Sequence, residues 1–298
     1  MLHVTNGTSV SLASAGVGGE VLAWLDVLHE GPVPDGLDAV ELRRVRGIFL
    51  DAELPGDTPA ELELARRDAT LSAYEEITLW FEHDLFDQLQ LIQILDRVQG
   101  SATQVGLICT DRYLGPMSST ELASLWPARH TVSESEFDLA EAAWHAFRAP
   151  DPVAIEALLA RDTSALPFLA GALRRHLQQF PAVASGLART ERQILQASLQ
   201  GRHTLASLFA ADQRMEERIF MGDASLRRWV SGLAECRHPL LAVEGGVYRV
   251  TSLGREALAG SVDHVRLNGI NRWLGGVHLI GNDVLWRWDE GAGRLCRK

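Results

Sequence analysis

Blocks of hydrophobic and polar residues alternate along the N-terminal part of the chain, and their spacing predicts an α/β fold. Segments with helical character separate four apolar runs that have the length of buried strands, at residues 2–5, 20–25, 77–81 and 104–110. Strands that alternate with helices favour right-handed connections and parallel pairing. We therefore expect residues 1–117 to form an open, mostly parallel, four-stranded Rossmann-like sheet.

The stretch from Ile77 to Leu95 contains the clearest passage from strand to helix. Its apolar first part ends at Phe81, three ionisable residues follow, and apolar residues then recur with helical spacing. Ligands of open α/β sheets bind outside the carboxyl ends of the strands. The pattern therefore predicts a functional edge at the sequence Glu82-His83-Asp84.

Two further regions follow the predicted sheet. Residues 118–185 have a largely helical pattern, and we expect them to form a helical connector. Residues 186–298 contain three helical segments and then a hairpin with a Gly245-Gly246 turn, which is the order of a winged-helix domain, followed by an aromatic β tail. The segment YRVTSLGREAL, residues 248–258, resembles the end of the wing in bacterial winged-helix proteins.

The charge of the chain is unevenly distributed. The net charge is −11, and the region from Gly186 onward contains 16 basic and 12 acidic residues, a net charge of +4. Residues 1–185 therefore carry −15, which argues against nucleic acid around the sheet. The basic C-terminal region permits DNA binding, for which the candidate phosphate contacts are Arg227, Arg228 and Arg249.

Composition excludes several mechanisms and compartments. The single lysine is Lys298, so no internal lysine is present for a Walker-type phosphate site, a Schiff base or a lysine general base. The chain has no apolar run of about 18 residues that would predict a membrane span, and its N-terminus lacks the pattern of a signal peptide. Three widely spaced cysteines form no CxxC pair, which indicates a reducing compartment. We expect a cytoplasmic protein.

Polar residues follow each of the four predicted strands, and parallel strands would bring them to one edge. Asp111 follows the fourth strand. The catalytic candidates are Asp26, His29, Glu30, His83 and Asp84. The candidates for binding a ligand or an anion are Asn6, Gly7, Thr8, Ser9, Asp87 and Gln88.

The first of these strand ends predicts an anion site. Asn6-Gly7 is a strong turn signal, and Thr8 or Ser9 is a natural N-cap for a helix over residues 10–17. Such a helix start presents free N–H groups to an anion. A plain turn between a strand and a helix is the alternative interpretation.

Simpler interpretations exist for the other candidates. Asp84 and Asp87 are also ordinary acids for the first turn of a helix. Two histidines beside several acids equally suit a stabilising hydrogen-bond network. A divalent metal held by His29, His83 and carboxylates is a further alternative, although the chain lacks HxE and HxxxH spacings. The cofactor therefore stays unknown.

The aromatic tail has two interpretations as well. Its tryptophans suit packing better than a platform for nucleobases, which is the alternative. The pair Gly275-Gly276 beside His278 is expected to allow the close approach of a ligand or of another backbone segment.

Several motifs in one order resemble an uncharacterised bacterial family that is known as a domain of unknown function. The similar segments are LHVTNGTS, WLDVLHEGPVP and FEHDLFDQLQLIQIL, with RWLGGVHL and WRWD in the tail. The resemblance covers roughly residues 1–115 and the tail. It implies no activity and assigns no roles, but it marks as motif positions Asn6, Gly7, Ser9, Asp26, His29, Glu30, Gly31, Pro32, His83, Asp84, Asp87 and Gln88.

Three functions agree with the sequence. The favoured one is a hydrolase, a transferase or a binding protein for a phosphorylated or nucleotide-like small molecule. His29 or His83 would act as general acid and base, oriented by Asp26 or Asp84. The second is a regulator that senses a ligand and binds DNA through the winged helix. The third is a protein-interaction module, with a homodimer as one form.

Overall fold

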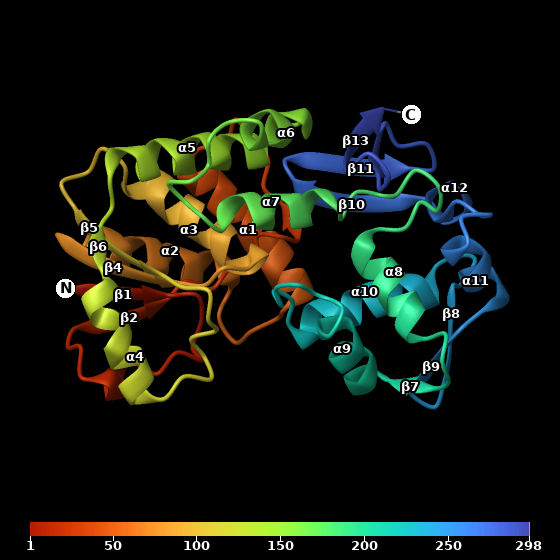
Figure 1. The fold of residues 1–298 in the computed structure, drawn as a ribbon, viewed down its shortest axis with the longest axis horizontal. Helices are drawn as coiled ribbons and strands as arrows, with labels where there is room; N and C mark the ends of the chain where they lie inside the picture. Colours follow the sequence, from red (N-terminus) through yellow and green to blue (C-terminus); the bar gives the residue numbers. More distant parts are fainter. Residues whose placement is uncertain (298) are drawn as a thin grey trace. The chain divides into compact units, whose positions relative to one another are not determined.

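The computed structural model describes residues 1–297, which form two compact units (Figure 1). The first unit comprises Met1–Leu173 and the short segment Gly275–Val277, and the second comprises Arg174–Leu274 and the chain from His278 onward. The sequence pattern places boundaries after residues 117 and 185 instead. Most of the expected connector belongs to the first unit, because helix α5 (Glu134–Arg148) packs against helix α3 (Leu85–Val98).

The first unit is built on a five-stranded sheet with the order β2-β1-β4-β5-β6, which confirms the predicted α/β class. Four strands run parallel, and they match the four apolar runs of the sequence: β1 (Leu2–Thr5), β2 (Glu20–Ala23), β4 (Glu76–Phe81) and β5 (Gln104–Cys109). The expectation of four strands is wrong by one, because β6 (His130–Thr131) adds an antiparallel edge. Two exposed residues leave no hydrophobic pattern by which a sequence could reveal this strand.

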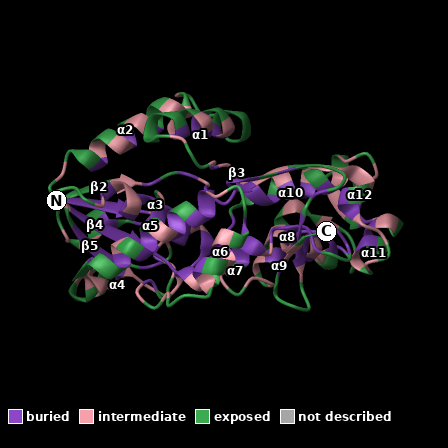
Figure 2. Cartoon of the chain, turned by 90° about the horizontal axis from the view of Figure 1, so that it is seen from above, coloured by how far each residue is buried: buried purple, intermediate pink, exposed green. Residues whose placement is uncertain are grey.

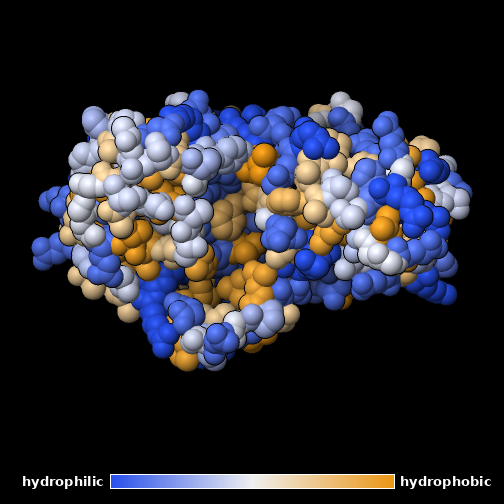
Figure 3. Space-filling model, turned by 90° about the horizontal axis from the view of Figure 1, so that it is seen from below, coloured by the Kyte–Doolittle hydropathy of each residue, from blue (hydrophilic) through white to orange (hydrophobic). Residues whose placement is uncertain are grey.

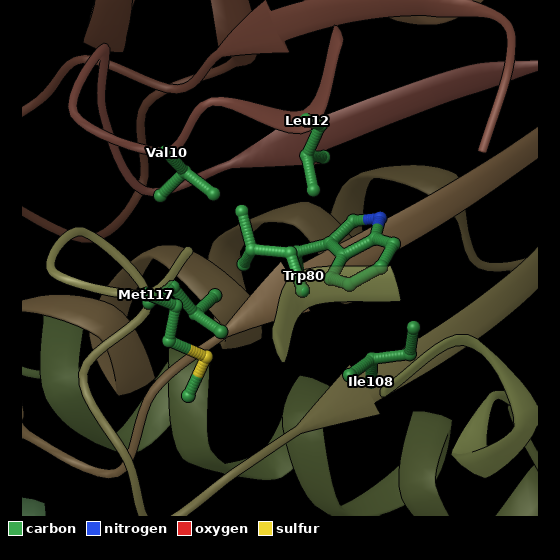
Figure 4. Packing of buried hydrophobic residues seen from close by; sticks show 7 residues of the cluster. Val10, Leu12, Trp80, Ile108 and Met117 are labelled. Carbon is green, nitrogen blue, oxygen red and sulfur yellow. The ribbon is translucent and has the colours of Figure 1, made fainter. Parts of the chain in front are cut away.

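Strand β4 lies in the middle of the sheet and supplies the core. Ile77 and Trp80 are fully buried. On one face of the sheet, Trp80 packs with residues from β5 and from the segments that follow β1 and β5: Val10, Leu12, Ile108, Leu114, Met117 and Leu122. Figure 4 shows Val10, Leu12, Ile108 and Met117 around Trp80. Burying each large apolar side chain stabilises the fold by about 1.5–3 kcal/mol.

The helices of the first unit differ in how deeply they are buried. Helix α3 is buried along nearly its whole length, including its predicted apolar face with Leu89 and Ile92. Helices α1 (Ala39–Glu53) and α2 (Ala60–Ser72) pack against each other and carry many exposed residues, which are green in Figure 2. The remaining helices are α4 (Ser119–Leu125), α6 (Val153–Leu159) and α7 (Leu169–Leu177), of which α7 extends into the second unit.

The pair Gly275-Gly276 packs against the end of α5, which confirms the expected close approach of another backbone segment. An added Cβ at Gly276 would lie 1.6 Å from the carbonyl oxygen of Arg148, and one at Gly275 would lie 2.2 Å from that of Phe147. The Gly276 N–H donates to the Phe147 carbonyl oxygen at 3.0 Å, and the Val33 N–H donates to the Gly275 carbonyl oxygen at 2.9 Å. Glycine is required because the two backbones are in direct contact.

The second unit combines helices with small antiparallel sheets. Helices α8 (Arg189–Ala197), α9 (Leu205–Gln213) and α10 (Asp223–Glu235) precede a sheet of order β7-β9-β8. Its strands are β7 (His203–Thr204), β8 (Leu241–Glu244) and β9 (Val247–Val250). The predicted turn joins β8 and β9, and both its glycines have positive φ, 58° and 74°, as a two-residue hairpin requires. Helices α11 (Ser252–Leu258) and α12 (His264–Asn268) follow.

The tail forms strands β10 (Ile270–Gly275), β11 (Val277–Gly281), β12 (Trp286–Asp289) and β13 (Arg294–Arg297). Trp286 and Trp288 are buried, and Trp273 stacks on His278 with the ring centroids 4.4 Å apart. These contacts support packing as the role of the tail tryptophans.

Within residues 1–297, every helix is too short or too polar to cross a lipid bilayer. Hydrophilic side chains, blue in Figure 3, are widely distributed over the face drawn there, with apolar residues between them.

Candidate functional site

The strands of the first unit end together, as the sequence predicts. Thr5, the last residue of β1, lies opposite Trp80 of β4, and Phe81 lies opposite Cys109, the last residue of β5. The residues that follow these strands therefore meet at the carboxyl edge of the sheet, where ligands of open α/β folds bind.

Three buried carboxylates form the centre of this edge, and we call Glu82, Asp84 and Asp87 the acidic cluster. Each offers an oxygen within 4.8 Å of oxygens of the other two. Their exposed fractions are 5%, 3% and 1%, so all three are shielded from bulk water. Among residues 1–297 this is the group found with the spacing of metal ligands, and neither His29 nor His83 belongs to it.

The start of α3 explains why the sequence folds in this way. Asp84 is the N-cap of the helix, and its carboxylate accepts the Asp87 N–H at 3.2 Å. The Asp87 carboxylate accepts the Glu82 N–H at 2.6 Å, which joins the helix to the end of β4. The helix N-terminus stabilises negative charge, so it offsets part of the repulsion within the acidic cluster.

Asn6 connects the acidic cluster to β1. Its side-chain amide donates to the Asp87 carboxylate at 2.8 Å and also hydrogen-bonds Glu82. The loop after β5 contributes as well, because the Leu114 N–H donates to the Glu82 carboxylate at 2.7 Å. The cluster is thus held by the ends of β1 and β4, the first turn of α3 and the loop after β5.

Burial and mutual repulsion raise the pKa of two of these acids. The pKa of Asp87 lies well above its usual value, mainly because of burial and then because of the charges of Asp84 and Glu82. Burial also raises the pKa of Glu82, although hydrogen bonds from Leu114, Asn6 and Gly115 oppose the rise. An acidic group of this kind retains a proton or binds a cation more readily than separate surface carboxylates do.

The side chain of Gln88 connects the ends of β4 and β5 at the carboxyl edge of the sheet. Its amide donates to the Glu82 carbonyl oxygen at 2.6 Å and lies 3.5 Å from the Sγ atom of Cys109. Burial raises the pKa of the Cys109 thiol to about 12. The thiol therefore stays protonated near neutral pH and is a poor nucleophile.

The two candidate histidines lie in aromatic surroundings. The His83 ring lies against Tyr113 and Phe168, with ring centroids 5.0 Å and 5.9 Å away. The His29 ring meets Phe86 edge to face at 6.0 Å. Phe86 is in the first turn of α3, so the structure brings His29 beside the same helix start as the acidic cluster. Both imidazoles are buried.

Asp26 has a different partner from the expected histidine. Its carboxylate accepts hydrogen bonds from Nη2 and Nε of Arg46, at 2.6 Å and 3.1 Å, and both side chains are 1% exposed. Arg46 also donates to the carbonyl oxygens of Val27, Glu30 and Pro32. Asp26 and Arg46 therefore fix the loop that carries His29 and Glu30, up to the short strand β3 (Gly31–Pro32).

The turn after β1 differs from the sequence-based expectation. In place of an α-helix capped by Thr8 or Ser9, the chain forms the short 3-10 helix η1 (Leu12–Ala15), whose N-cap is Ser11 without a side-chain cap. Four residues of 3-10 helix provide no appreciable dipole, and glycines 16, 18 and 19, all with positive φ, prevent its extension. The helix-based anion site at Asn6-Gly7-Thr8-Ser9 is therefore not formed, although Asn6 does reach the acidic cluster.

Two further residues differ from the expectation that the sequence pattern gives for them. Asp111 is exposed, and it does not belong to the acidic cluster. Arg46 was missed, because an arginine in a helix with Arg43 and Arg44 has the pattern of a solvated face. Its burial against the facing loop would become visible only in three dimensions.

Comparison with known proteins adds no relative: no family model matches the chain, and neither does any curated protein.

We expect Arg46→Met to destabilise the first unit by about 3–5 kcal/mol, because it leaves the Asp26 carboxylate buried without its charge partner. Combining it with Asp26→Leu should recover part of this loss, since no buried charge then remains. Urea unfolding of the full chain measures both effects. Arg44→Met, at an exposed position of the same helix, is the control and should change stability by less than about 0.5 kcal/mol. Equal effects of Arg46→Met and Arg44→Met would contradict this account of the loop.

We expect Asp84→Asn to stabilise the protein at pH 7, because asparagine caps a helix as well as aspartate does but removes one charge from the acidic cluster. The raised pKa of Asp87 means that the folded chain retains a proton that the unfolded chain loses above about pH 4. Ionisation of Asp87 thus lowers stability as the pH rises, and the variant weakens this effect.

The gain should be on the order of 1 kcal/mol at pH 7 and should vanish near pH 3, where Asp87 is protonated in both states. Thermal unfolding of wild type and variant across this pH range measures it. Asp38→Asn, at the exposed N-cap of α1, is the matched control and should change little at either pH. A variant that is less stable than wild type at pH 7 would argue against repulsion within the cluster.

Proposed function

We propose that the first unit binds a phosphorylated or nucleotide-like small molecule at the carboxyl edge of its sheet and acts on it as a hydrolase or transferase. The observation that carries this proposal is the acidic cluster, three buried carboxylates within 4.8 Å of one another. The helix N-terminus and the hydrogen bonds offset only part of the repulsion, and buried titratable groups with raised pKa values are typical of functional sites.

The chemistry of the acidic cluster restricts how such a ligand binds. A phosphate group cannot approach three carboxylates unless protons or a cation reduce their charge. Oxygen ligands from carboxylates are those that Mg²⁺ and Mn²⁺ prefer, and Mg²⁺ commonly joins one or two carboxylates to substrate phosphates. We therefore assign Glu82, Asp84 and Asp87 to a divalent cation, which would supply charge neutralisation and orientation of the phosphate.

Side chains around the cluster suit the remaining tasks of such a site. His83 follows Glu82 directly, and the His29 ring lies against the first turn of α3, so each is a candidate for general acid and base chemistry near neutral pH. The Oδ1 atom of Asn6 is buried, and no hydrogen-bond partner is found for it within residues 1–297. It is an acceptor that a ligand hydroxyl or a metal-bound water would satisfy.

The resemblance to the bacterial family of unknown function agrees with this location. Its motif positions include Asn6, Asp84, Asp87 and Gln88, whose side chains form or brace the acidic cluster. We propose that the chain belongs to this family and that the shared motifs build the cation site.

We propose a winged helix for the second unit, because three helices precede the β8–β9 hairpin. The surroundings of its candidate arginines favour DNA binding less. Of the three candidate arginines, Arg249 is paired with Glu244 at 2.8 Å, and Arg228 is partly buried and donates to Ser225. Arg227 is exposed. Phosphate binding requires several available cations, so a contact to another protein, including a second copy of this chain, is the better alternative.

Titration of the full chain with Mn²⁺ and Mg²⁺ by calorimetry tests the cation assignment. We expect one cation per chain, with affinity reduced at least about tenfold in Asp84→Asn and Asp87→Asn, because each removes one charged ligand. Asp96→Asn is the matched control, since Asp96 lies on the same helix and its pKa is also raised by burial, but it is not in the acidic cluster. An equal loss in this control, or the absence of cation binding in the wild type, would refute the assignment.

The reaction is tested by a separate measurement. The full chain with Mg²⁺ is screened for hydrolysis of nucleotides and sugar phosphates, and His83→Gln is then compared with wild type on any substrate found. We expect kcat to fall about 100-fold or more with the substrate KM little changed, as for loss of a general acid or base. Turnover and substrate binding that survive this change would remove His83 from the reaction.

A further inference from the structure

A second polar cluster lies on the helices of the first unit, and we call Arg43, Arg67, Arg97 and Asp68 the arginine cluster. The three guanidinium groups come from α1, α2 and α3 and share the single carboxylate of Asp68. Arg43 Nη1 lies 3.0 Å from Oδ2, and Arg67 Nη2 lies 3.1 Å from Oδ1, which Arg97 also contacts.

Charge in and beside the arginine cluster is not balanced. A further pair, Arg46 with Asp26, contributes as well, since the Asp26 charge acts on Arg67. The Asp96 charge acts on Arg97. Four guanidinium groups, of Arg43, Arg46, Arg67 and Arg97, thus stand against the three carboxylates of Asp26, Asp68 and Asp96. Burial, opposed by Asp26 and Asp68, lowers the pKa of Arg67 to about 10. Guanidinium groups remain protonated at this pKa, so an excess of positive charge persists at neutral pH.

Two donors of the cluster have no acceptor. Nη1 of Arg67 and Nε of Arg43 are buried, and no hydrogen-bond partner is found for either within residues 1–297. The face of the Trp24 ring, 3.7 Å from the Arg67 guanidinium carbon, compensates only part of this cost. Leaving buried charged donors unsatisfied is costly, and a native structure normally supplies an acceptor.

Solvent reaches the arginine cluster at two places. The side chains of Arg43 and Arg97 are 19% and 20% exposed, whereas Arg67 is only 6% exposed. A small ligand can therefore contact the outer arginines and come close to the buried one. The planar guanidinium fork matches the oxygens of phosphate.

We propose that the arginine cluster is a binding site for a small oxyanion of the phosphate class. The negative charge of the oxyanion would compensate the positive charge of the guanidinium groups that the carboxylate of Asp68 does not neutralise. The site is separate from the acidic cluster, because Arg97 lies ten residues after Asp87 on α3, a distance of about 15 Å along the helix axis. It does not depend on the proposed function, since it uses other residues and no cation. Free phosphate and the phosphate group of a metabolite present the same oxygens, and affinity distinguishes them.

Calorimetric titration of the full chain at constant ionic strength tests this proposal, with inorganic phosphate in one arm and glucose 6-phosphate in the other. We expect saturable binding of one phosphate per chain, weakened at least about tenfold in Arg43→Gln and in Arg97→Gln. Asp68→Asn should strengthen binding, because it removes the competing carboxylate. The arm with the higher affinity identifies the source of the phosphate group.

Arg44→Gln is the matched control, since Arg44 follows Arg43 on the same helix, is 61% exposed and lies 4.0 Å from Glu61 instead of in the cluster. It should leave phosphate affinity unchanged, and so should Asp84→Asn in the acidic cluster. Phosphate that binds no better than chloride would overturn the proposal, as would equal losses in Arg44→Gln and Arg43→Gln. Loss of phosphate binding in Asp84→Asn would place the phosphate at the acidic cluster and overturn it as well. Both arginine variants alter partly exposed positions, so the result does not depend on the buried Arg67.

Discussion

The burial of three carboxylates at the start of α3 is the constraint on which the sheet edge depends. Charges this close in a protein interior repel strongly unless hydrogen bonds, a helix N-terminus, protons or a cation compensate them. Here the Glu82 and Leu114 N–H groups and the Asn6 amide supply hydrogen bonds from three separate segments. The acidic cluster therefore holds β1, β4 and the loop after β5 in register at one place.

Much of this arrangement follows from the local sequence. The apolar run of β4, the polar break and the helical spacing of α3 predict a strand that turns directly into a helix, and the structure has this turn. Four parallel strands that are each followed by polar residues predict that these polar residues lie close together at one edge of the sheet. The register of β1, β4 and β5 has this effect, because the three strands end at nearly the same level. The sequence places Asp84 among the acids at the start of this helix, and in the structure it is the N-cap, a role that is decided within one turn of chain.

Other parts of the site depend on contacts between distant segments, which one sequence does not specify. Arg46 is separated by 20 residues from Asp26, and its pattern within α1 is that of a surface arginine. Asn6 meets Asp87 across 81 residues. The helix expected after β1 fails for a local reason, since several glycines with positive φ end it after four residues of 3-10 helix. The arginine cluster likewise becomes visible only when α1, α2 and α3 bring their side chains to Asp68.

The first unit thus contains two opposite departures from charge balance, an excess of carboxylates at the N-terminus of α3 and an excess of guanidinium groups near its C-terminus. We infer that the acidic cluster at the N-terminus of α3 is a divalent cation site. Crystals of the full chain soaked in Mn²⁺ test it most directly, through an anomalous difference map. The account predicts one strong peak within about 2.0–2.4 Å of oxygens from at least two of Glu82, Asp84 and Asp87. A map without a peak at the acidic cluster, with Mn²⁺ bound elsewhere on the chain, would contradict it.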